Sequence, residues 1–244
     1  MHESISVFFP AYNDEHTIGT LVRRTLAFLP KYFDDYEVIA VNDGSRDATA
    51  AVLEGLRLEF PERFRVITHQ TNKGYGGALQ SGFAAASKEL VFYTDGDGQY
   101  DPLELRSLIR LMSPSVGFVN GYKLDRRDPW HRVALGYLYN HFARFIFGIQ
   151  LRDIDCDFRL IRRSLIDDVS LTCTSGTVCV ELVKKLELCP YLVEEVGVHH
   201  YARRHGRSQF FRLRSLITTF YQLMSLYVSL VLLPQRKVRT ARSV

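Results

Sequence analysis

The feature that most constrains the fold is a regular alternation along the first half of the chain. Five short apolar runs are separated by stretches with helical apolar spacing; the runs lie at 5–10, 36–41, 64–69, 90–94 and 116–120. Such runs are typical of buried strands, and the stretches between them predict helices at 17–29, 47–60, 76–87 and 102–112. Strands that alternate with helices predict an α/β fold with a doubly wound, mostly parallel sheet.

The length of 244 residues suits one large α/β domain. No linker and no internal repeat interrupts the chain, so we expect one domain with a C-terminal extension. The first residues, MHESISVFFPAYND, lack a basic segment followed by an apolar one and do not resemble a signal peptide. The four cysteines show no C-x-x-C spacing, which predicts buried, reduced thiols in a cytosolic protein. A zinc site of cysteine with His199 and His200 is the less favoured alternative.

Polar, flexible segments follow the first four predicted strands. They read PAYND, NDGSRD, HQTNKGYGG and DGDGQ in chain order. Ligands of open α/β sheets bind beyond the carboxyl ends of the strands, so we expect these segments to meet at one edge. The glycine-rich third segment is neither a Walker A loop nor G-x-G-x-x-G, which argues against a Rossmann oxidoreductase. Its glycines are expected to let a helix pack closely on the sheet.

Asp95 and Asp97 carry the strongest chemical signal. An Asp-Gly-Asp segment alone is typical of a turn. At a strand end, however, both carboxylates and the amide of Gln99 could reach one Mg²⁺ or Mn²⁺ ion, which prefers oxygen ligands and keeps positions open for phosphate. Asp43 either belongs to a helix cap near Asp47 or accepts the N–H of a uracil or guanine base, and the two roles are compatible.

Several motifs together resemble a known family. PAYND, VNDGSRDAT, NKGYGGALQSGF and YTDGDGQYDP, in that order, resemble the family 2 glycosyltransferases with the GT-A fold. GYKLDRRDPWHR, YNHFARFIFGIQLRDIDCDFRLIRR and VEEVGVHHYARRHGRSQFF are similar to the polyprenyl-phosphate branch, which includes dolichol-phosphate mannosyltransferase. The resemblance covers about 4–212. It implies a GT-A domain over 1–210 with an acceptor loop at about 121–152, followed by a membrane-associating segment at 211–244.

The resemblance implies a site for Mg²⁺ or Mn²⁺ in which Asp97 is the main ligand. Gln99 and Asp95 would stand beside it, and Asp95 would also contact the nucleotide. The nucleoside would be held by residues after the first two strands, namely Pro10, Tyr12, Asp14 and Asp43. Asp14 stands where the family usually has glutamate.

The resemblance also implies residues that bind phosphate. Lys123, Arg126 and Arg132 fall in the acceptor loop, where many relatives carry arginine at the first position. Arg203 and Ser208 match the pattern R-x-x-G-x-S, which faces the phosphates in the family. Arg132 and Arg203 are also expected to act in catalysis.

Three aspartates at alternate positions, Asp153, Asp155 and Asp157, precede FRLIRR. They form either an exposed strand edge or an acidic group near the acceptor. We select Asp157 as the catalytic candidate, against a structural ion pair with Arg159 or Arg162. A hydroxyl acceptor would need such a base, whereas a phosphate monoester is mostly ionised at neutral pH.

The leading hypothesis is an inverting, metal-dependent glycosyltransferase. It would move a sugar from a UDP- or GDP-sugar to a polyprenyl (dolichyl or undecaprenyl) phosphate at the cytoplasmic face of a membrane. One alternative is transfer to a saccharide hydroxyl in cell-wall or polysaccharide synthesis. Another is a non-catalytic scaffold that binds nucleotide or membrane. Basic residues are concentrated in four segments, but acidic strand ends argue against nucleic acid as a partner.

The segment LITTFYQLMSLYVSLVLL (216–233) contains no charged residue. Its 18 residues would span about 27 Å as a helix, close to the lower limit for crossing a bilayer. A stripe of polar residues and basic flanks favour a helix in the membrane interface; spanning and packing in a homo-oligomer remain alternatives. The aromatic-rich helical run at 130–147 is expected at the membrane face or in the core.

Overall fold

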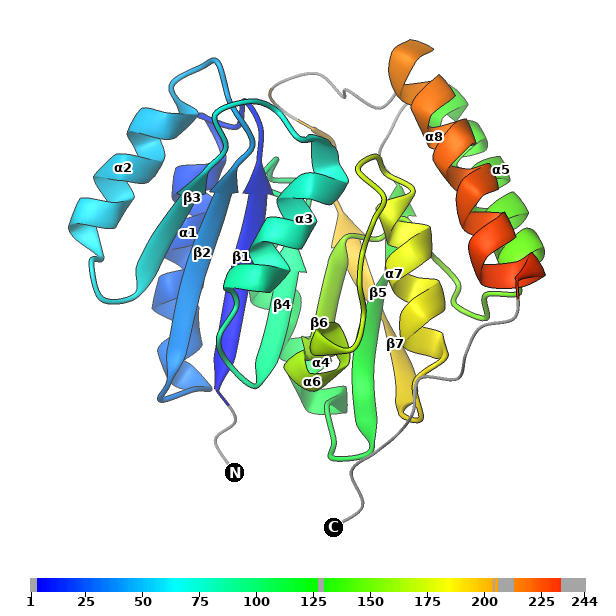
Figure 1. Cartoon of the computed structure of the whole chain (residues 1–244). Coiled ribbons are helices and arrows are strands. Elements are labelled where there is room, and N and C mark those ends of the chain that lie inside the picture. The colour runs from blue at the N-terminus through cyan, green and yellow to red at the C-terminus, as the bar shows by residue number, and fades with distance from the viewer. Residues whose placement is uncertain (1–3, 127–129, 204, 206–212, 234–244) are drawn as a thin grey trace.

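The chain forms a seven-stranded sheet with helices on both faces (Figure 1). The computed structural model describes residues 4–126, 130–203, 205 and 213–233, and the side chains at 125–126, 131–132 and 213–216 also lie outside this description. The strands are β1 (Ile5–Ala11), β2 (Tyr36–Asn42), β3 (Phe64–Thr68), β4 (Leu90–Thr94), β5 (Val116–Arg126), β6 (Phe158–Arg162) and β7 (Leu192–His200). Their order in the sheet is β3-β2-β1-β4-β6-β5-β7.

The sheet is mostly parallel, as predicted. Strands β3, β2, β1 and β4 run parallel to one another, and β7 runs parallel to β5. Strand β6 is antiparallel to both of its neighbours, β4 and β5. Thr94 at the end of β4 pairs with Phe158 at the start of β6. The reversed strand therefore brings Asp157 next to Asp95, at the edge where the parallel strands end.

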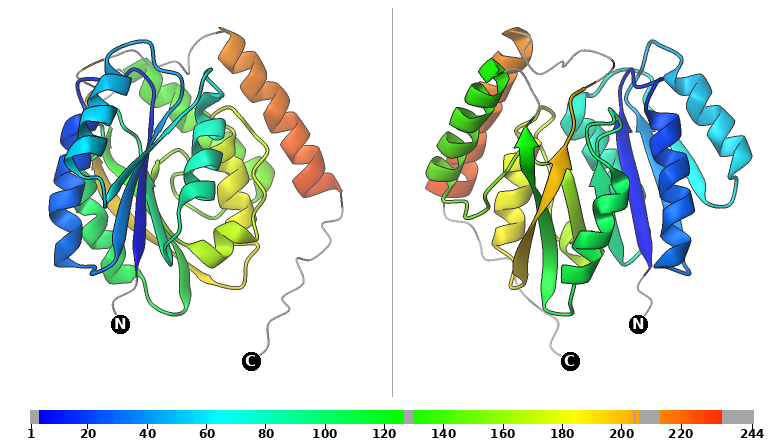
Figure 2. Two further views of the ribbon diagram at one scale, coloured as in Figure 1. Left: turned by 60° about the vertical axis from the view of Figure 1, so that its left-hand side comes forward. Right: turned by 180° about the vertical axis from the view of Figure 1, so that it is seen from behind.

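The helices form one layer on each face (Figure 2). One layer contains α1 (Ile18–Phe28), α2 (Thr49–Glu59) and α4 (Leu105–Leu111), with 3-10 turns at Leu29–Lys31 and Pro102–Glu104. The other contains α3 (Gly74–Ala85), α6 (Arg163–Asp167) and α7 (Val178–Glu187). The predicted strands and helices of the first half are all present, with ends displaced by at most three residues, except that β5 extends six residues further than expected.

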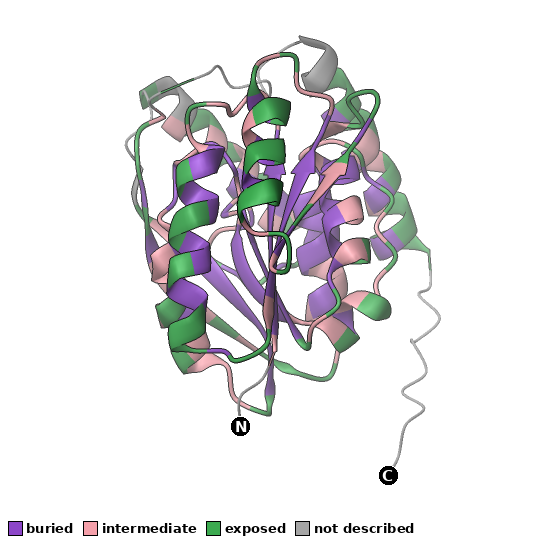
Figure 3. Ribbon diagram, turned by 90° about the vertical axis from the view of Figure 1, so that its left-hand side faces the viewer, coloured by how far each residue is buried: buried purple, intermediate pink, exposed green. Residues whose placement is uncertain are grey.

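Both faces of the sheet are buried, which explains the continuous apolar runs in the sequence (Figure 3). Along β1, Val7 and Phe9 pack with one helix layer while Phe8 packs with the other. Gly82 of α3 lies directly on Phe8, because a Cβ atom there would be 2.3 Å from the Phe8 ring. The prediction concerned the glycines of HQTNKGYGG instead, and at Gly76 it is wrong. A Cβ atom there would be 2.1 Å from the carbonyl oxygen of Cys173, so this glycine packs against the loop before α7 and not against the sheet.

Two further helices lie side by side, outside α7 (Figures 1 and 2). They are α5 (Trp130–Phe147) and α8 (Leu213–Tyr227), which continues as a π-helical turn at Val228–Leu232. The predicted acceptor loop therefore contains the end of a strand and an 18-residue helix. Within the described residues, no helix combines the length and hydropathy of a membrane span.

The four cysteines are free thiols, as expected, and all but the half-buried Cys189 are buried. No group of three or more histidine, cysteine, aspartate or glutamate side chains in the described residues could hold a metal ion. The zinc alternative therefore has no support there. The alternative of a strand edge at 153–157 is wrong, since this segment is a loop that leads into β6.

Candidate active site

Hydrogen bonds join the segments that follow β1, β2 and β4. The Asp43 N–H donates to the carbonyl of Ala11 at 2.9 Å, and the Gly96 N–H donates to the carbonyl of Pro10 at 3.1 Å. The Thr17 hydroxyl donates to the carbonyl of Gly96 at 2.7 Å. The predicted convergence of these segments at one edge of the sheet is confirmed.

Asp14 is held between the first two of these segments. One of its carboxylate oxygens accepts the N–H of Tyr12 at 2.9 Å, and its own N–H donates to the Thr49 hydroxyl at 2.8 Å. Burial raises the pKa of Asp14 to about 7, and the nearby charge of Asp97 adds to this effect. Asp14 therefore holds its proton more tightly than an exposed aspartate does.

Asp97 and Gln99 already contact a positive charge. The Arg203 guanidinium pairs with one Asp97 oxygen and donates to Gln99 Oε1 at 3.2 Å. The other Asp97 oxygen accepts the N–H of Gln99 at 2.9 Å. Burial raises the pKa of Asp97, while Arg203 opposes this shift. Both side chains therefore present oxygens to a cationic group in this structure.

Asp95 is close to two other carboxylates, those of Asp97 and Asp157. It accepts the hydroxyl of Tyr75 at 2.8 Å. Burial raises the pKa of Asp95 well above its usual range, and the charges of Asp157 and Asp97 raise it further. Asp95, Asp97 and Asp157 thus share a small region, and among the described residues Arg203 pairs with Asp97 and Arg159 pairs with Asp157. A divalent ion bound by one or two carboxylates and by substrate phosphates would relieve this repulsion.

Asp157 is held by a buried arginine. Arg159 is fully buried and its Nη1 lies 3.2 Å from Asp157. The same guanidinium donates to Asn120 Oδ1 at 2.8 Å and to the Tyr93 hydroxyl. The structural ion pair with Arg159 is therefore present, whereas Arg162 donates to main-chain carbonyls instead. Because Asp157 also adjoins Asp95, the ion pair does not remove it from the site.

This arrangement agrees with a family match that covers more than half of the chain. Residues 6–170 match the family described as glycosyl transferase family 2. The chain belongs to this family.

Two curated relatives are named undecaprenyl-phosphate 4-deoxy-4-formamido-L-arabinose transferase. The protein from Enterobacter sp. (strain 638) is 28% identical over 221 residues, and that from Aeromonas hydrophila subsp. hydrophila is 29% identical over 222. Each alignment covers 91% of this chain, but 66% and 67% of the two relatives. The chain thus spans about two thirds of the length of these relatives.

Solved structures confirm the GT-A fold of this glycosyltransferase. Glucosyl-3-phosphoglycerate synthase from Mycobacterium tuberculosis in complex with UDP is 20% identical, with a TM-score of 0.68 over 96% of this chain and 82% of that one. The complex of the same enzyme with Mn²⁺, UDP and phosphoglyceric acid gives a TM-score of 0.70 at 20% identity, over 96% and 80% of the two chains.

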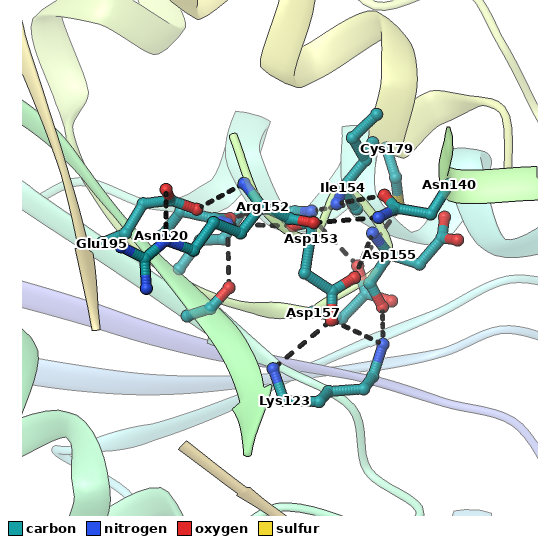
Figure 4. Close-up of polar contacts among 12 residues, drawn as sticks. Asn120, Lys123, Asn140, Arg152, Asp153, Ile154, Asp155, Asp157, Cys179 and Glu195 are labelled. Carbon is teal, nitrogen blue, oxygen red and sulfur yellow. Dashed lines mark hydrogen bonds and ion pairs between the residues drawn. The ribbon is translucent and has the colours of Figure 1, made fainter. Parts of the chain in front are cut away.

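Lys123 of this glycosyltransferase is buried beside the loop that contains Asp153 and Asp155 (Figure 4). Its ammonium is 3.6 Å from the carboxylate of Asp153 and donates to the carbonyl of Asp155. The side chain is only 5% exposed. In this structure Lys123 holds the 153–157 loop against β5, so its predicted contact with acceptor phosphate would require it to leave these partners.

Three predicted phosphate-binding residues, Ser208, Arg126 and Arg132, lie wholly or partly outside the described structure. Ser208 lies outside the described residues. Arg126 ends β5 and Arg132 belongs to α5, but their side chains also lie outside the description. Their roles in this glycosyltransferase stay predictions.

Sequence reasoning missed His69 and the role of Tyr75. His69 Nδ1 lies 2.6 Å from Asp43 Oδ1, and its Nε2 lies 2.8 Å from the Ser81 hydroxyl. Both missed residues belong to HQTNKGYGG, which was interpreted through its glycines alone. A histidine directly after a buried strand, in the segment next to NDGS, was the available signal.

Proposed function

We propose that this chain is an inverting, metal-dependent glycosyltransferase that moves a sugar from a nucleotide-sugar to a polyprenyl phosphate. The observation that carries the proposal is the set of strand-end oxygens on Asp97 and Gln99, which already contact a cationic group. Family membership and the names of the curated relatives support sugar transfer to a lipid phosphate.

The metal would be Mg²⁺ or Mn²⁺, because related folds are solved with either ion and UDP. Asp97 and Gln99 would hold it, with Asp95 beside them. When bound, the ion supplies positive charge for a departing diphosphate. Arg203 would exchange its contact with Asp97 for contacts with the diphosphate, since a guanidinium binds both groups well.

The donor would be a UDP-sugar first and a GDP-sugar second, because UDP is the nucleotide in the solved relatives. Pro10, Tyr12, Asp14 and Asp43 would hold the nucleoside. The bond between the anomeric carbon and the diphosphate oxygen breaks, and the electron pair leaves with the nucleotide. An acceptor oxygen attacks from the opposite face, which inverts the configuration.

A phosphate acceptor suits the observed state of Asp157. A phosphate monoester is mostly ionised at neutral pH and needs no base. Asp157 already accepts hydrogen bonds from Arg159 and from the Cys179 thiol, at 3.2 and 3.1 Å. Both contacts are with Oδ1, and a phosphate acceptor would need no proton transfer to the other oxygen, whereas a saccharide hydroxyl would. The acceptor phosphate would be bound by Lys123, Arg126, Arg132 and Ser208.

The outer surfaces of α5 and α8 would face the membrane, together with the tail through 244. Large apolar side chains project from both helices into solvent; they include Trp130 (82% exposed), Phe145 (86%), Phe220 (64%) and Tyr221 (74%). Aromatic side chains favour the interface between lipid and water. We propose that α8 lies in this interface at the cytoplasmic face.

A donor panel with and without lipid tests the proposal. Purified protein with Mn²⁺ is given UDP- and GDP-sugars, with and without a short polyprenyl phosphate, while nucleotide release and lipid product are followed. We expect lipid-dependent release from one donor. Asp97→Asn should lower it by about 10³-fold, whereas Asp167→Asn, at an exposed carboxylate on α6, should not.

Two other outcomes would replace the proposal. Donor binding without lipid-dependent turnover would favour a saccharide hydroxyl as acceptor. An absence of donor binding in the presence of Mn²⁺ would favour a non-catalytic scaffold.

A further inference from the structure

His69 is a buried titratable residue for which the proposed reaction has no direct use. It follows β3, and its side chain is 4% exposed. Its N–H donates to the carbonyl of Asn42 at 2.9 Å, which fixes the backbone beside the end of β2. Both ring nitrogens have partners, Asp43 on one side and Ser81 on the other. The ring therefore has one orientation in this structure.

The partners determine which ring nitrogen carries the proton. An ionised carboxylate only accepts hydrogen bonds, so the 2.6 Å contact with Asp43 Oδ1 requires a hydrogen on Nδ1. In the neutral ring Nε2 then accepts the Ser81 hydroxyl at 2.8 Å. With a neutral ring, the result is a directed chain in which Ser81 donates to His69 and His69 donates to Asp43.

Hydrogen bonds fix the main chain and one carboxylate oxygen of Asp43. Its Oδ1 also accepts the Lys73 N–H at 2.8 Å, so this oxygen has two donors. The main-chain carbonyl of Asp43 accepts the side-chain amide of Asn72 at 3.0 Å, and its N–H donates to Ala11. Across the described ranges, no group donates to the second carboxylate oxygen, Oδ2. One oriented acceptor is thus left at the edge where the nucleoside is proposed to bind.

We propose that His69 is a positioning residue that aims Asp43 Oδ2 at an imino N–H of the donor base. This inference rests on the proposed function, in which Asp43 contacts the nucleoside. Uracil and guanine carry an imino N–H on their pairing edge, whereas cytosine and adenine present a lone pair there. A carboxylate that cannot turn away would repel that lone pair, so His69 would contribute to selecting the base as well as to binding it.

A structural role alone would have different consequences. If His69 merely satisfied buried polar groups, its loss would lower stability and weaken all nucleotides equally. If it aims Asp43, its loss would weaken UDP or GDP more than CDP or ADP. The ratio of the two affinities separates these roles, and a global loss of stability does not change it.

The test measures binding of UDP, CDP, GDP and ADP to the whole chain with Mn²⁺ by calorimetry. His69→Ala should raise the Kd of the preferred nucleotide by about 10-fold and reduce its preference over the matching CDP or ADP, because a hydrogen bond to a charged group is lost. His69→Asn can place an amide N–H near the position of Nδ1 and should restore most of the preference. His141→Ala, on exposed α5, is the matched control and should change neither value.

Ser81→Ala keeps the test decisive if His69→Ala does not fold. It leaves the ring in place but removes the partner of Nε2, and should lower the preference about 3-fold, as a neutral hydrogen bond would. An unchanged preference in the folded His69 and Ser81 variants would overturn the inference alone. Wild-type protein that binds none of the four nucleotides would overturn the proposed function, and this inference with it.

Discussion

Two regions of the molecule, the strand ends of the first half and the helices α5 and α8 of the second half, differ in how they place polar and apolar groups. At the ends of β1, β2 and β4, the site carboxylates are largely buried and each accepts hydrogen bonds from neighbouring segments. On α5 and α8, large apolar side chains are exposed instead. The first half thus prepares charges inside the protein, where oriented groups act strongly. The second leaves large apolar side chains exposed to solvent.

Arg159 connects the two halves, and its loss should have the largest effect. The guanidinium bonds to Tyr93 on β4, to Asn120 on β5 and to Asp157 between them. Arg159→Met would leave Asp157 without its buried partner, so we expect a loss of about 3–5 kcal/mol in the free energy of unfolding. Urea unfolding measures this value. Arg57→Met, at an exposed pair with Glu54, should change it little; equal stability of the two variants would contradict the role of Arg159.

The exposed aromatic surface should matter for membranes and little for folding. Phe145→Ser combined with Phe220→Ser removes two side chains that are 86% and 64% exposed. We expect about 10³-fold weaker binding to vesicles of anionic phospholipid, because each buried phenylalanine contributes about 2 kcal/mol and about 1.4 kcal/mol corresponds to a factor of ten. The melting temperature should stay the same.

The matched control for this surface is Leu58→Ser on α2, in the other half of the molecule. Leu58 is 68% exposed and should not affect vesicle binding. Cosedimentation with the vesicles compares the variants. If Leu58→Ser weakened vesicle binding as much as the double phenylalanine variant does, exposed apolar residues would act regardless of their position. The proposed difference between the two halves would then be wrong.

The carboxylates of the first half predict a dependence of stability on pH without metal. The pKa of Asp14 rises from 3.8 to about 7 on folding. Asp14 contributes fully to the free energy of unfolding below about pH 4, where it is protonated in both the folded and the unfolded protein. This contribution is lost as the pH rises through about 7. Melting temperatures in EDTA should therefore fall by a few degrees over this range, and less in Asp14→Asn.

Asp47 supplies a control of opposite sign. It is close to the same segments, but hydrogen bonds from Thr49 and Glu15 lower its pKa despite partial burial. Its contribution is present above its unfolded pKa and is lost as pH falls through the folded value. Asp47→Asn should remove stability at neutral pH, and a flatter profile in that variant than in Asp14→Asn would contradict the assignment.

The smallest expected effect tests a direct link between the halves. Gln222 of α8 accepts from the Ser175 N–H and hydroxyl at 3.0 and 2.8 Å, and donates to Thr174. The Thr174 carbonyl in turn accepts the N–H of Gly76, next to Tyr75. Gln222→Ala should lower stability by about 1 kcal/mol and weaken UDP binding by a few-fold, without changing vesicle binding. Thr218→Ala, at an exposed position of the same helix, should leave all three unchanged.

The alternation of the first half was enough to predict β1 to β5, because strands buried on both faces read as continuous apolar runs. β6 was not predicted, since FRLIR contains Arg159, whose burial depends on partners far away in sequence. Asp43 and Asp97 were found because carboxylates at strand ends are conspicuous. The contact of Asp97 with Arg203 crosses 106 positions, and the contact of His69 with Asp43 crosses 26. Neither contact can be predicted from a local pattern, although Arg203 lies in R-x-x-G-x-S and His69 directly follows a buried strand.

The contact of Gln222 with the 174–175 segment also bears on how such a chain can change over generations. A helix that only rested on lipid could be exchanged for any apolar segment of similar length. One face of α8 instead packs against the rest of the protein, through the hydrogen bonds of Gln222 and the buried side chains of Leu223 and Leu226. Among the described residues, the opposite face has no such partners. Substitutions should accumulate at two speeds along a single helix, and transplanting it into another enzyme would succeed only with the 174–175 segment moved alongside.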